Sequence, residues 1–199
     1  MKNILIVVFV LFSANAFADD ITSFFGERLT GLELEMAGKG WKHIRTDIPN
    51  TKGSESMCFG GIHIIDKKSG LIVGEANDCL SNVQDNNGAL QVFGTTFLNF
   101  FGADDVHTLI VQGNITVQPV TAPAKTAWGM KVTHITGSSN EVGNNAVIGG
   151  SGFFEGATGT GRISGMVDMS KIDHPTDPHI VFSCMLSVTD LQLASWAIR

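Results

Sequence analysis

Short segments in which apolar and polar residues alternate follow one another along most of this chain. In residues 107–120 the apolar side chains share one face and the polar ones mostly the other, with Leu109, Val111, Ile115 and Val117 against Thr108, Gln112, Asn114, Thr116 and Gln118. A second apolar face near the C-terminus comprises Ile180, Phe182, Cys184, Leu186 and Val188. Because side chains of a strand alternate between its two faces, both segments are predicted to be β-strands with one buried face.

Further strands are expected where β-branched and aromatic residues are enriched, at 32–36, 41–48, 58–66, 71–79, 89–101, 131–137 and 161–169. Turn-forming residues separate them, as in Asp85-Asn86-Asn87-Gly88 and Gly137-Ser138-Ser139-Asn140. The sequence has no long amphipathic helix pattern, internal repeat or linker-like composition. It is therefore predicted to fold as a single all-β domain, an antiparallel barrel or sandwich.

Residues 1–18 have the pattern of a secretory signal peptide. Lys2 precedes an apolar run from Ile4 to Phe12, and Ala16-Phe17-Ala18 matches a cleavage site. The run is about half of the roughly 20 apolar residues that span a bilayer, which argues against a transmembrane anchor. We expect cleavage after Ala18, a secreted or periplasmic protein, and one all-β domain over residues 19–199.

Composition narrows the choice of partners. The chain has 13 Lys and Arg against 19 Asp and Glu, a formal net charge of -6. Without a basic stripe, nucleic acid and anionic membrane surfaces are disfavoured as partners. No later segment is long and apolar enough for stable membrane insertion.

The cysteine positions suggest one disulfide. Residues 58–66 and 71–79 flank Lys67-Lys68-Ser69-Gly70, which is a good hairpin turn. Symmetric pairing about this turn places Cys58 opposite Cys79, close to the separation that a disulfide needs. We therefore predict a Cys58–Cys79 bond and a buried free thiol at Cys184.

The glycine-rich segment 149–161, GGSGFFEGATGTG, resembles a phosphate-binding loop only superficially. Glu155 stands where the third glycine of a dinucleotide fingerprint after Gly150 and Gly152 should be. No lysine follows the last glycine, and the segment that follows is strand-like rather than helical. A tight connection in a closed barrel is favoured instead, with Phe153 and Phe154 plugging the adjacent core.

The same segment carries a resemblance to a known family. Residues 146–159, AVIGGSGFFEGATG, resemble the G-G-[ST]-G-x-[FY]-x-G-A-x-G signature of the allene oxide cyclase barrel and the related dirigent proteins. The cyclase side is the closer match, because Ser151, Glu155 and Gly156 all fit its pattern. Residues 113–118 are similar to the strand that precedes the signature, and residues 178–186 lie where the family has its closing strand.

The resemblance implies an eight-stranded antiparallel β-barrel with an apolar lumen, often assembled as a trimer. Allene oxide cyclases cyclise an unstable fatty-acid epoxide and dirigent proteins steer the coupling of phenolic radicals; neither uses a metal or an organic cofactor. We accordingly expect no cofactor and an apolar small-molecule ligand. Phe153 and Thr158 stand where dirigent proteins carry an aspartate and an arginine, which puts dirigent-type chemistry in doubt.

Candidate catalytic residues come from residues 32–38, LELEMAG. Plant allene oxide cyclases carry a glutamate and an asparagine on the first strand, followed by Ser-Pro, whereas this chain offers Glu33 and Glu35. The two glutamates share one strand face. They could form an acid/base pair in the lumen; the alternative, which we favour, is an ordinary solvated face with the flanking leucines in the core.

Other polar and aromatic side chains are candidates for binding a substrate in the lumen: Glu75, Asn77, Phe97, Asn99, Phe153 and His63. Asp173, His174, Asp177 and His179 are metal-ligand types in a short window, but their spacing matches no site pattern, so we interpret them as a surface loop without metal.

Three function classes remain. The first is a cofactor-free isomerase or cyclase acting on a lipid-like or polyketide-like apolar molecule in the lumen. The second is a non-catalytic carrier of such a ligand. The third is a structural or interaction barrel filled by its own side chains. The resemblance favours the first, and a buried carboxylate with a raised pKa would support it.

Overall fold

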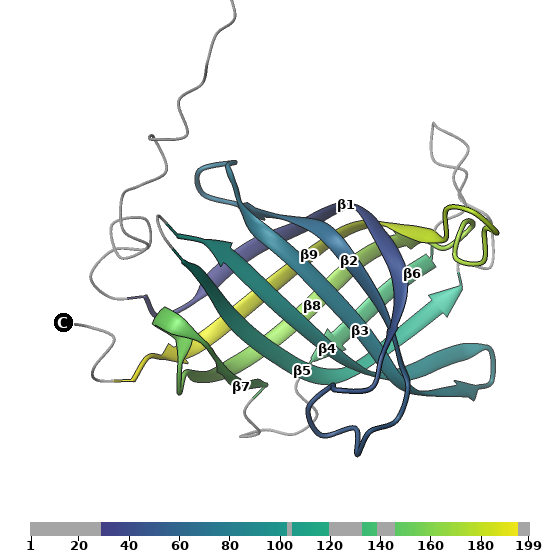
Figure 1. Cartoon of the computed structure of the whole chain (residues 1–199), viewed down its shortest axis with the longest axis horizontal. Helices are drawn as coiled ribbons and strands as arrows, with labels where there is room; N and C mark the ends of the chain where they lie inside the picture. Colours follow the sequence, from purple (N-terminus) through teal and green to yellow (C-terminus); the bar gives the residue numbers. More distant parts are fainter. Residues whose placement is uncertain (1–28, 103–104, 120–132, 139–145, 195–199) are drawn as a thin grey trace, which may run out of the picture.

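A computed structural model describes residues 29–102, 105–119, 133–138 and 146–194. These residues form nine β-strands and one short 3-10 turn (Figure 1). The elements are β1 (Leu32–Arg45), β2 (Ser56–Asp66), β3 (Ile72–Asn86), β4 (Ala89–Phe101), β5 (Val106–Pro119), β6 (Thr133–Ser138), β7 (Val147–Gly150), η2 (Gly152–Phe154), β8 (Thr158–Asp168) and β9 (His179–Gln192). Among the described residues, no helix is long and apolar enough to cross a membrane.

Eight of the strands close into an antiparallel barrel. Hydrogen-bonded neighbours run β1, β2, β3, β4, β5, β6, β8 and β9, and β9 pairs back onto β1. The predicted all-β, eight-stranded antiparallel barrel is confirmed. A barrel of this size is just wide enough for side chains to fill it or for one small ligand to bind.

The apolar faces predicted from the alternation of apolar and polar residues are the faces that line the barrel. Leu109, Val111, Ile115 and Val117 of β5 are buried inside it, as are Ile180, Phe182, Cys184, Leu186 and Val188 of β9. One contiguous apolar core fills the interior. Burying such side chains contributes about 1.5–3 kcal/mol each, which makes the lumen the main source of stability.

In the described part of the chain, β5 and β8 are bridged at two separate places. β6 pairs with β5 only from Asn114 onward, whereas the β7 pairings end at Val111. Just before β7, Ala146 bridges the strands: its carbonyl accepts from the Gln112 N–H and its N–H donates to the Gly159 carbonyl. Gly113 and Gly161 lie between these two bridges along β5 and β8, and both line the same pocket.

The glycine-rich segment closes one end of the barrel. Gly152 and Gly156 adopt φ angles of 58° and 69°, which favour glycine and allow the tight η2 turn. The turn places Phe154 inside the barrel with no exposed surface, where its ring centroid lies 5.2 Å from that of Phe100. The expected plug is therefore present, and Phe153 packs against the same core.

The loop between β8 and β9 covers the opposite end. Met169 and Ile172 of this loop pack against the core. Lys42 on β1 holds the loop through Asp173 at 2.7 Å, and the Trp41 indole N–H donates to Asp177 at 3.2 Å.

A second, smaller apolar cluster lies outside the barrel around a disulfide. Cys58 of β2 lies opposite Cys79 of β3, and the two sulfurs are bonded. Ile48, from the segment between β1 and β2, and Phe97 of β4 pack on the disulfide. Gln112 of β5 anchors the same segment by donating to the Pro49 carbonyl at 2.8 Å and accepting from Asn50 at 2.7 Å.

Candidate functional site

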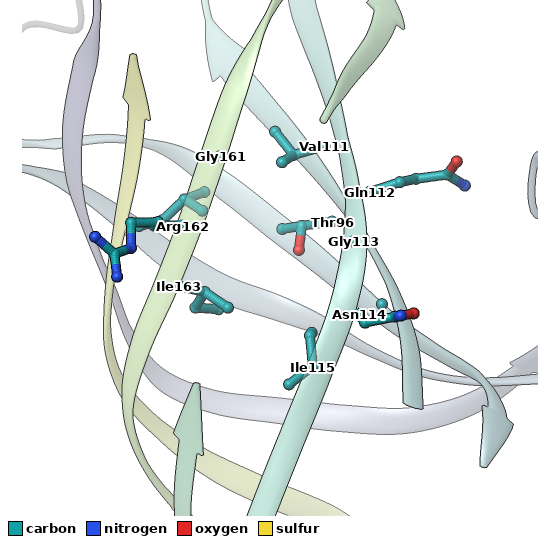
Figure 2. Close-up of a pocket in the computed structure, with 11 residues that line it drawn as sticks. Thr96, Val111, Gln112, Gly113, Asn114, Ile115, Gly161, Arg162 and Ile163 are labelled. Atoms are coloured by element: carbon teal, nitrogen blue, oxygen red, sulfur yellow. The ribbon is translucent and has the colours of Figure 1, made fainter. Parts of the chain in front are cut away.

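The described part of the chain contains a pocket between β5 and β8 (Figure 2). Its apolar lining comes from Val111 and Ile115 of β5, Ile163 of β8 and Leu186 of β9. Gly94, Gly113 and Gly161 contribute backbone only. The cavity volume is about 20 Å³, which is enough for one ordered water molecule.

Figure 2 shows which side chains point into this space. Val111, Thr96, Ile163 and Ile115 lie between the ribbons of β5 and β8, whereas Gln112, Asn114 and Arg162 point away. The alternation of a strand explains the division, because residues 111, 113 and 115 share the inner face and residues 112 and 114 the outer one.

Thr96 connects the pocket to a buried carboxyl group. Its hydroxyl donates to Asp78 Oδ1 at 2.6 Å, and the two residues are directly opposite on β4 and β3. Asp78 is 3% exposed and Thr96 is 5% exposed. The Thr96 hydroxyl occupies one of the about four acceptor positions of the carboxyl group.

The apolar surroundings alter the acidity of Asp78. Burial raises the pKa of this carboxyl to about 6, and the hydrogen bond from Thr96 opposes the rise. Phe59 on β2 lies directly beside Asp78 in the sheet register and is also fully buried. Near neutral pH the group can therefore hold or release a proton, which is the requirement for general acid–base chemistry.

Cys184 is a second chemically reactive group in the described part of the lumen. Burial raises the pKa of its thiol to about 12, and the negative charge of Asp78 adds to this effect. Its Sγ lies 3.5 Å from the Met166 carbonyl, to which the thiol donates. A thiol held protonated in this way is a weak nucleophile.

The structure places the two glutamates proposed from the sequence on the outer face of the barrel. Glu33 is exposed, and Glu35 is half-buried beside Lys67, with 4.0 Å between the charged atoms. The inward positions of β1 belong to Leu32, Leu34 and Met36. Glu33 and Glu35 therefore do not face the lumen, and the solvated-face alternative describes them correctly.

The polar candidates His63, Glu75, Asn77 and Asn99 lie on the outer face too. His63, Glu75 and Asn99 occupy neighbouring positions on β2, β3 and β4, and Asn99 accepts from Thr108 at 2.9 Å. Asn77 lies 3.4 Å from the His43 ring. The structure brings these residues together as an external polar row, not as a lumen site.

The two aromatic candidates have packing roles. Phe97 is half-buried on the outer face over the Cys58–Cys79 disulfide, and the Arg45 guanidinium lies 4.7 Å from its ring centroid. Phe153 is half-buried at the barrel end, and its backbone N–H donates to His107 at 3.1 Å. Phe97 therefore lies outside the lumen, and Phe153 lies at its rim.

The residues proposed as a surface loop form an ion-pair network. His179 contacts Asp177 both at the carboxylate, 3.3 Å away, and at the backbone carbonyl, 2.8 Å away. No group of three or more His, Cys, Asp or Glu among the described residues could hold a metal ion.

Sequence reasoning did not select Asp78 and Thr96. The available signal was the alternation of side chains along β3: Asp78 shares a face with Gly74 and Ala76, whereas Glu75 and Asn77 lie on the other face. Because the inward residues of this strand are small, its hydrophobic alternation is weak, and the more conspicuous polar residues were preferred.

Comparison with protein-family models, with curated proteins and with solved structures finds no match to this chain. The chemistry of the lumen therefore has to be inferred from its own geometry.

Proposed function

We propose that this protein is a cofactor-free isomerase or cyclase that binds a small apolar molecule in the barrel lumen and moves a proton with Asp78. One observation carries the proposal: a buried carboxyl accepts a hydrogen bond from Thr96, which lines an apolar pocket between β5 and β8. The resemblance of residues 146–159 to the allene oxide cyclase signature supports the same function class.

The chemistry requires only a proton and an oriented ligand. In its ionised form Asp78 accepts a proton from a carbon next to a carbonyl, and in its protonated form it returns that proton elsewhere on the ligand. A carbon–carbon double bond of the ligand thereby moves to a neighbouring position, and no oxidant or reductant is consumed. The raised pKa of Asp78 makes both forms accessible near neutral pH.

The test reaction is the isomerisation of cyclohex-3-enone to cyclohex-2-enone, followed by the ultraviolet absorbance of the conjugated product. We expect the purified protein to accelerate it, and Asp78→Asn to lower the rate about 10²-fold or more, because general acid–base groups contribute on this scale. Thr96→Val should change the pH profile of the rate, because it removes the hydrogen bond that opposes the rise in the Asp78 pKa.

Glu33→Gln and Glu35→Gln serve as comparison variants on the outer face and should retain the rate. Loss of activity in these variants but not in Asp78→Asn would overturn the assignment of Asp78.

A barrel filled by its own side chains is the second candidate, and the cavity volume of about 20 Å³ favours it. This candidate predicts no rate acceleration and no changes in the NMR chemical shifts of the protein when the ketone is added. A carrier would give the chemical-shift changes without turnover. Export after cleavage at Ala18 and trimeric assembly remain predictions from the N-terminal pattern and the resemblance.

A further inference from the structure

The β3–β4 hairpin ends in a tight two-residue turn formed by Asn87 and Gly88. Both residues have positive φ angles, 53° and 87°, and the flanking residues Asn86 and Ala89 pair with each other. This pattern is typical of a type I′ turn, for which Asn-Gly is a preferred sequence. Asn87-Gly88 is also the one Asn-Gly pair in the whole sequence.

The turn has little support from the rest of the barrel. In the described part of the chain β3 pairs with β2 only as far as Leu80, and every residue from 82 to 88 is exposed. A Cβ built on Gly88 would have no heavy atom within 4 Å apart from its chain neighbours. Exposed segments with few buried contacts open at low free energy, so the Asn87 side chain is accessible to water and has room to change conformation.

An asparagine followed by glycine is open to a specific reaction of its amide. The Gly88 nitrogen can attack Cγ of Asn87, because glycine has no Cβ that hinders the approach. The N–Cγ bond forms, the Cγ–Nδ2 bond breaks, and ammonia leaves with the proton that the Gly88 nitrogen gives up. Water then opens the resulting succinimide ring at either carbonyl, which leaves aspartate or isoaspartate at position 87. No oxidant or reductant takes part.

Asp85 holds the nitrogen that would make this attack. The Gly88 N–H donates to Asp85 Oδ1 at 3.0 Å, in an exposed hydrogen bond. The bond fixes the position of the nitrogen, and the negative charge of the carboxylate opposes loss of the amide proton. Both effects act against the attack.

We propose that Asn87 is the principal site of spontaneous deamidation in this protein and that Asp85 restrains the reaction. The product carries an additional negative charge beside Asp85. Isoaspartate also adds a carbon atom to the backbone of the turn, which weakens the pairing of Asn86 with Ala89. The modification lies outside the barrel core and is independent of the function proposed for the lumen.

The experiment is incubation of the folded full chain in mildly alkaline buffer, followed by peptide mass spectrometry that distinguishes asparagine, aspartate and isoaspartate. We expect conversion at Asn87 to be several-fold faster than at Asn82 and Asn86, which are also exposed but are not followed by glycine. Gly88→Ala should slow the conversion several-fold, because its methyl group hinders the attack. Asp85→Ala should accelerate it several-fold.

Gly70→Ala is the matched control. Gly70 is also in a hairpin turn, with a φ angle of 71° and no heavy atom within 4 Å of an added Cβ, but it follows Ser69. This variant should leave the conversion at Asn87 unchanged. It therefore separates the strain of alanine at a positive φ angle from the loss of the reactive Asn-Gly pair.

Conversion that is faster at Asn82 or Asn86 than at Asn87 would overturn the assignment of the site. An unchanged rate in Asp85→Ala would overturn the restraint. Because Gly88→Ala and Asp85→Ala are expected to act in opposite directions, loosening of the hairpin alone cannot produce both results.

Discussion

At the scale of single residues, the neighbours of a side chain matter more than its type. Glu33 and Asp78 are both carboxylic acids on barrel strands, but the first is exposed to solvent and the second is enclosed by apolar residues. Enclosure disfavours the charged form of Asp78, and the hydrogen bond from Thr96 only partly compensates. Burial of Asp78 therefore allows acid–base chemistry and also lowers the stability of the folded state.

This cost predicts a pH dependence of folding. The pKa of Asp78 rises from 3.8 to about 6 on folding, so its contribution to stability is complete below about pH 4 and is lost as the pH rises through about 6. A shift of this size corresponds to about 3 kcal/mol. Asp78→Asn cannot ionise, so its free energy of unfolding relative to the unmodified sequence should rise by about that amount between pH 4 and pH 7.

Urea denaturation at a series of pH values measures this difference. Asp105→Asn, at an exposed position, is the control and should show no such trend. A constant difference between Asp78→Asn and the unmodified sequence across the range would mean that Asp78 is not enclosed as described.

At the scale of elements, the β2–β3 hairpin illustrates how local sequence sets register. The turn after Asp66 is stabilised by donation from the Ser69 N–H to the Asp66 carboxylate at 2.7 Å and by the Gly70 N–H to the Asp66 carbonyl at 2.8 Å. This turn aligns Cys58 with Cys79 even though the pairing shifts twice between them. The Cys58–Cys79 disulfide of this hairpin is the centre of the small apolar cluster outside the barrel, on which the segment between β1 and β2 packs through Ile48.

Removing the disulfide should destabilise the folded state. The cysteines are 21 residues apart in the sequence, and a covalent loop of this length is worth about 3 kcal/mol. We expect the double variant Cys58→Ala, Cys79→Ala to unfold at a lower urea concentration by a corresponding amount. The unmodified protein, unfolded in urea in the presence of a reductant that keeps Cys58 and Cys79 as free thiols, provides an independent comparison. An unchanged midpoint in both samples would contradict the prediction.

At the scale of the whole molecule, closure of the barrel determines what is inside. Because β9 pairs back onto β1 and β4 pairs with β5, the strands of the ring have neighbours on both sides and leave few exposed edges. The glycine-rich segment completes this closure, since its turn directs Phe154 into the end of the lumen. A segment with the appearance of a ligand-binding loop thus serves the packing of the barrel.

Replacement of this plug should show its importance. Phe154→Ala removes a fully buried ring and should lower the free energy of unfolding by about 3–5 kcal/mol. Phe153→Ala, at the half-buried neighbouring position, should cost clearly less. Thermal or urea unfolding of the two variants measures the contrast, and equal losses would argue against a plug formed by Phe154.

Much of the architecture could be read from the sequence because it depends on local patterns. The strong alternation in β5 and β9 predicted their inward faces, the turn at residues 67–70 predicted the β2–β3 register, and the spacing of the glycines excluded a nucleotide loop. The candidate site could not be read in the same way. In β4, phenylalanines lie on both faces, with Phe100 inward and Phe97 outward, so periodicity alone does not reveal which face is the lumen.

The sequence by itself determined that this chain forms antiparallel strands and where most of them turn, because those properties depend on residues near one another. Only the tertiary structure decided that Asp78, rather than Glu33 or Glu35, lies inside the barrel. A side chain changes face with every residue, so its environment depends on which face the closed sheet turns inward. It also decided that a pocket lies between β5 and β8, because the positions where β6 and β7 pair with β5 depend on long-range hydrogen bonds.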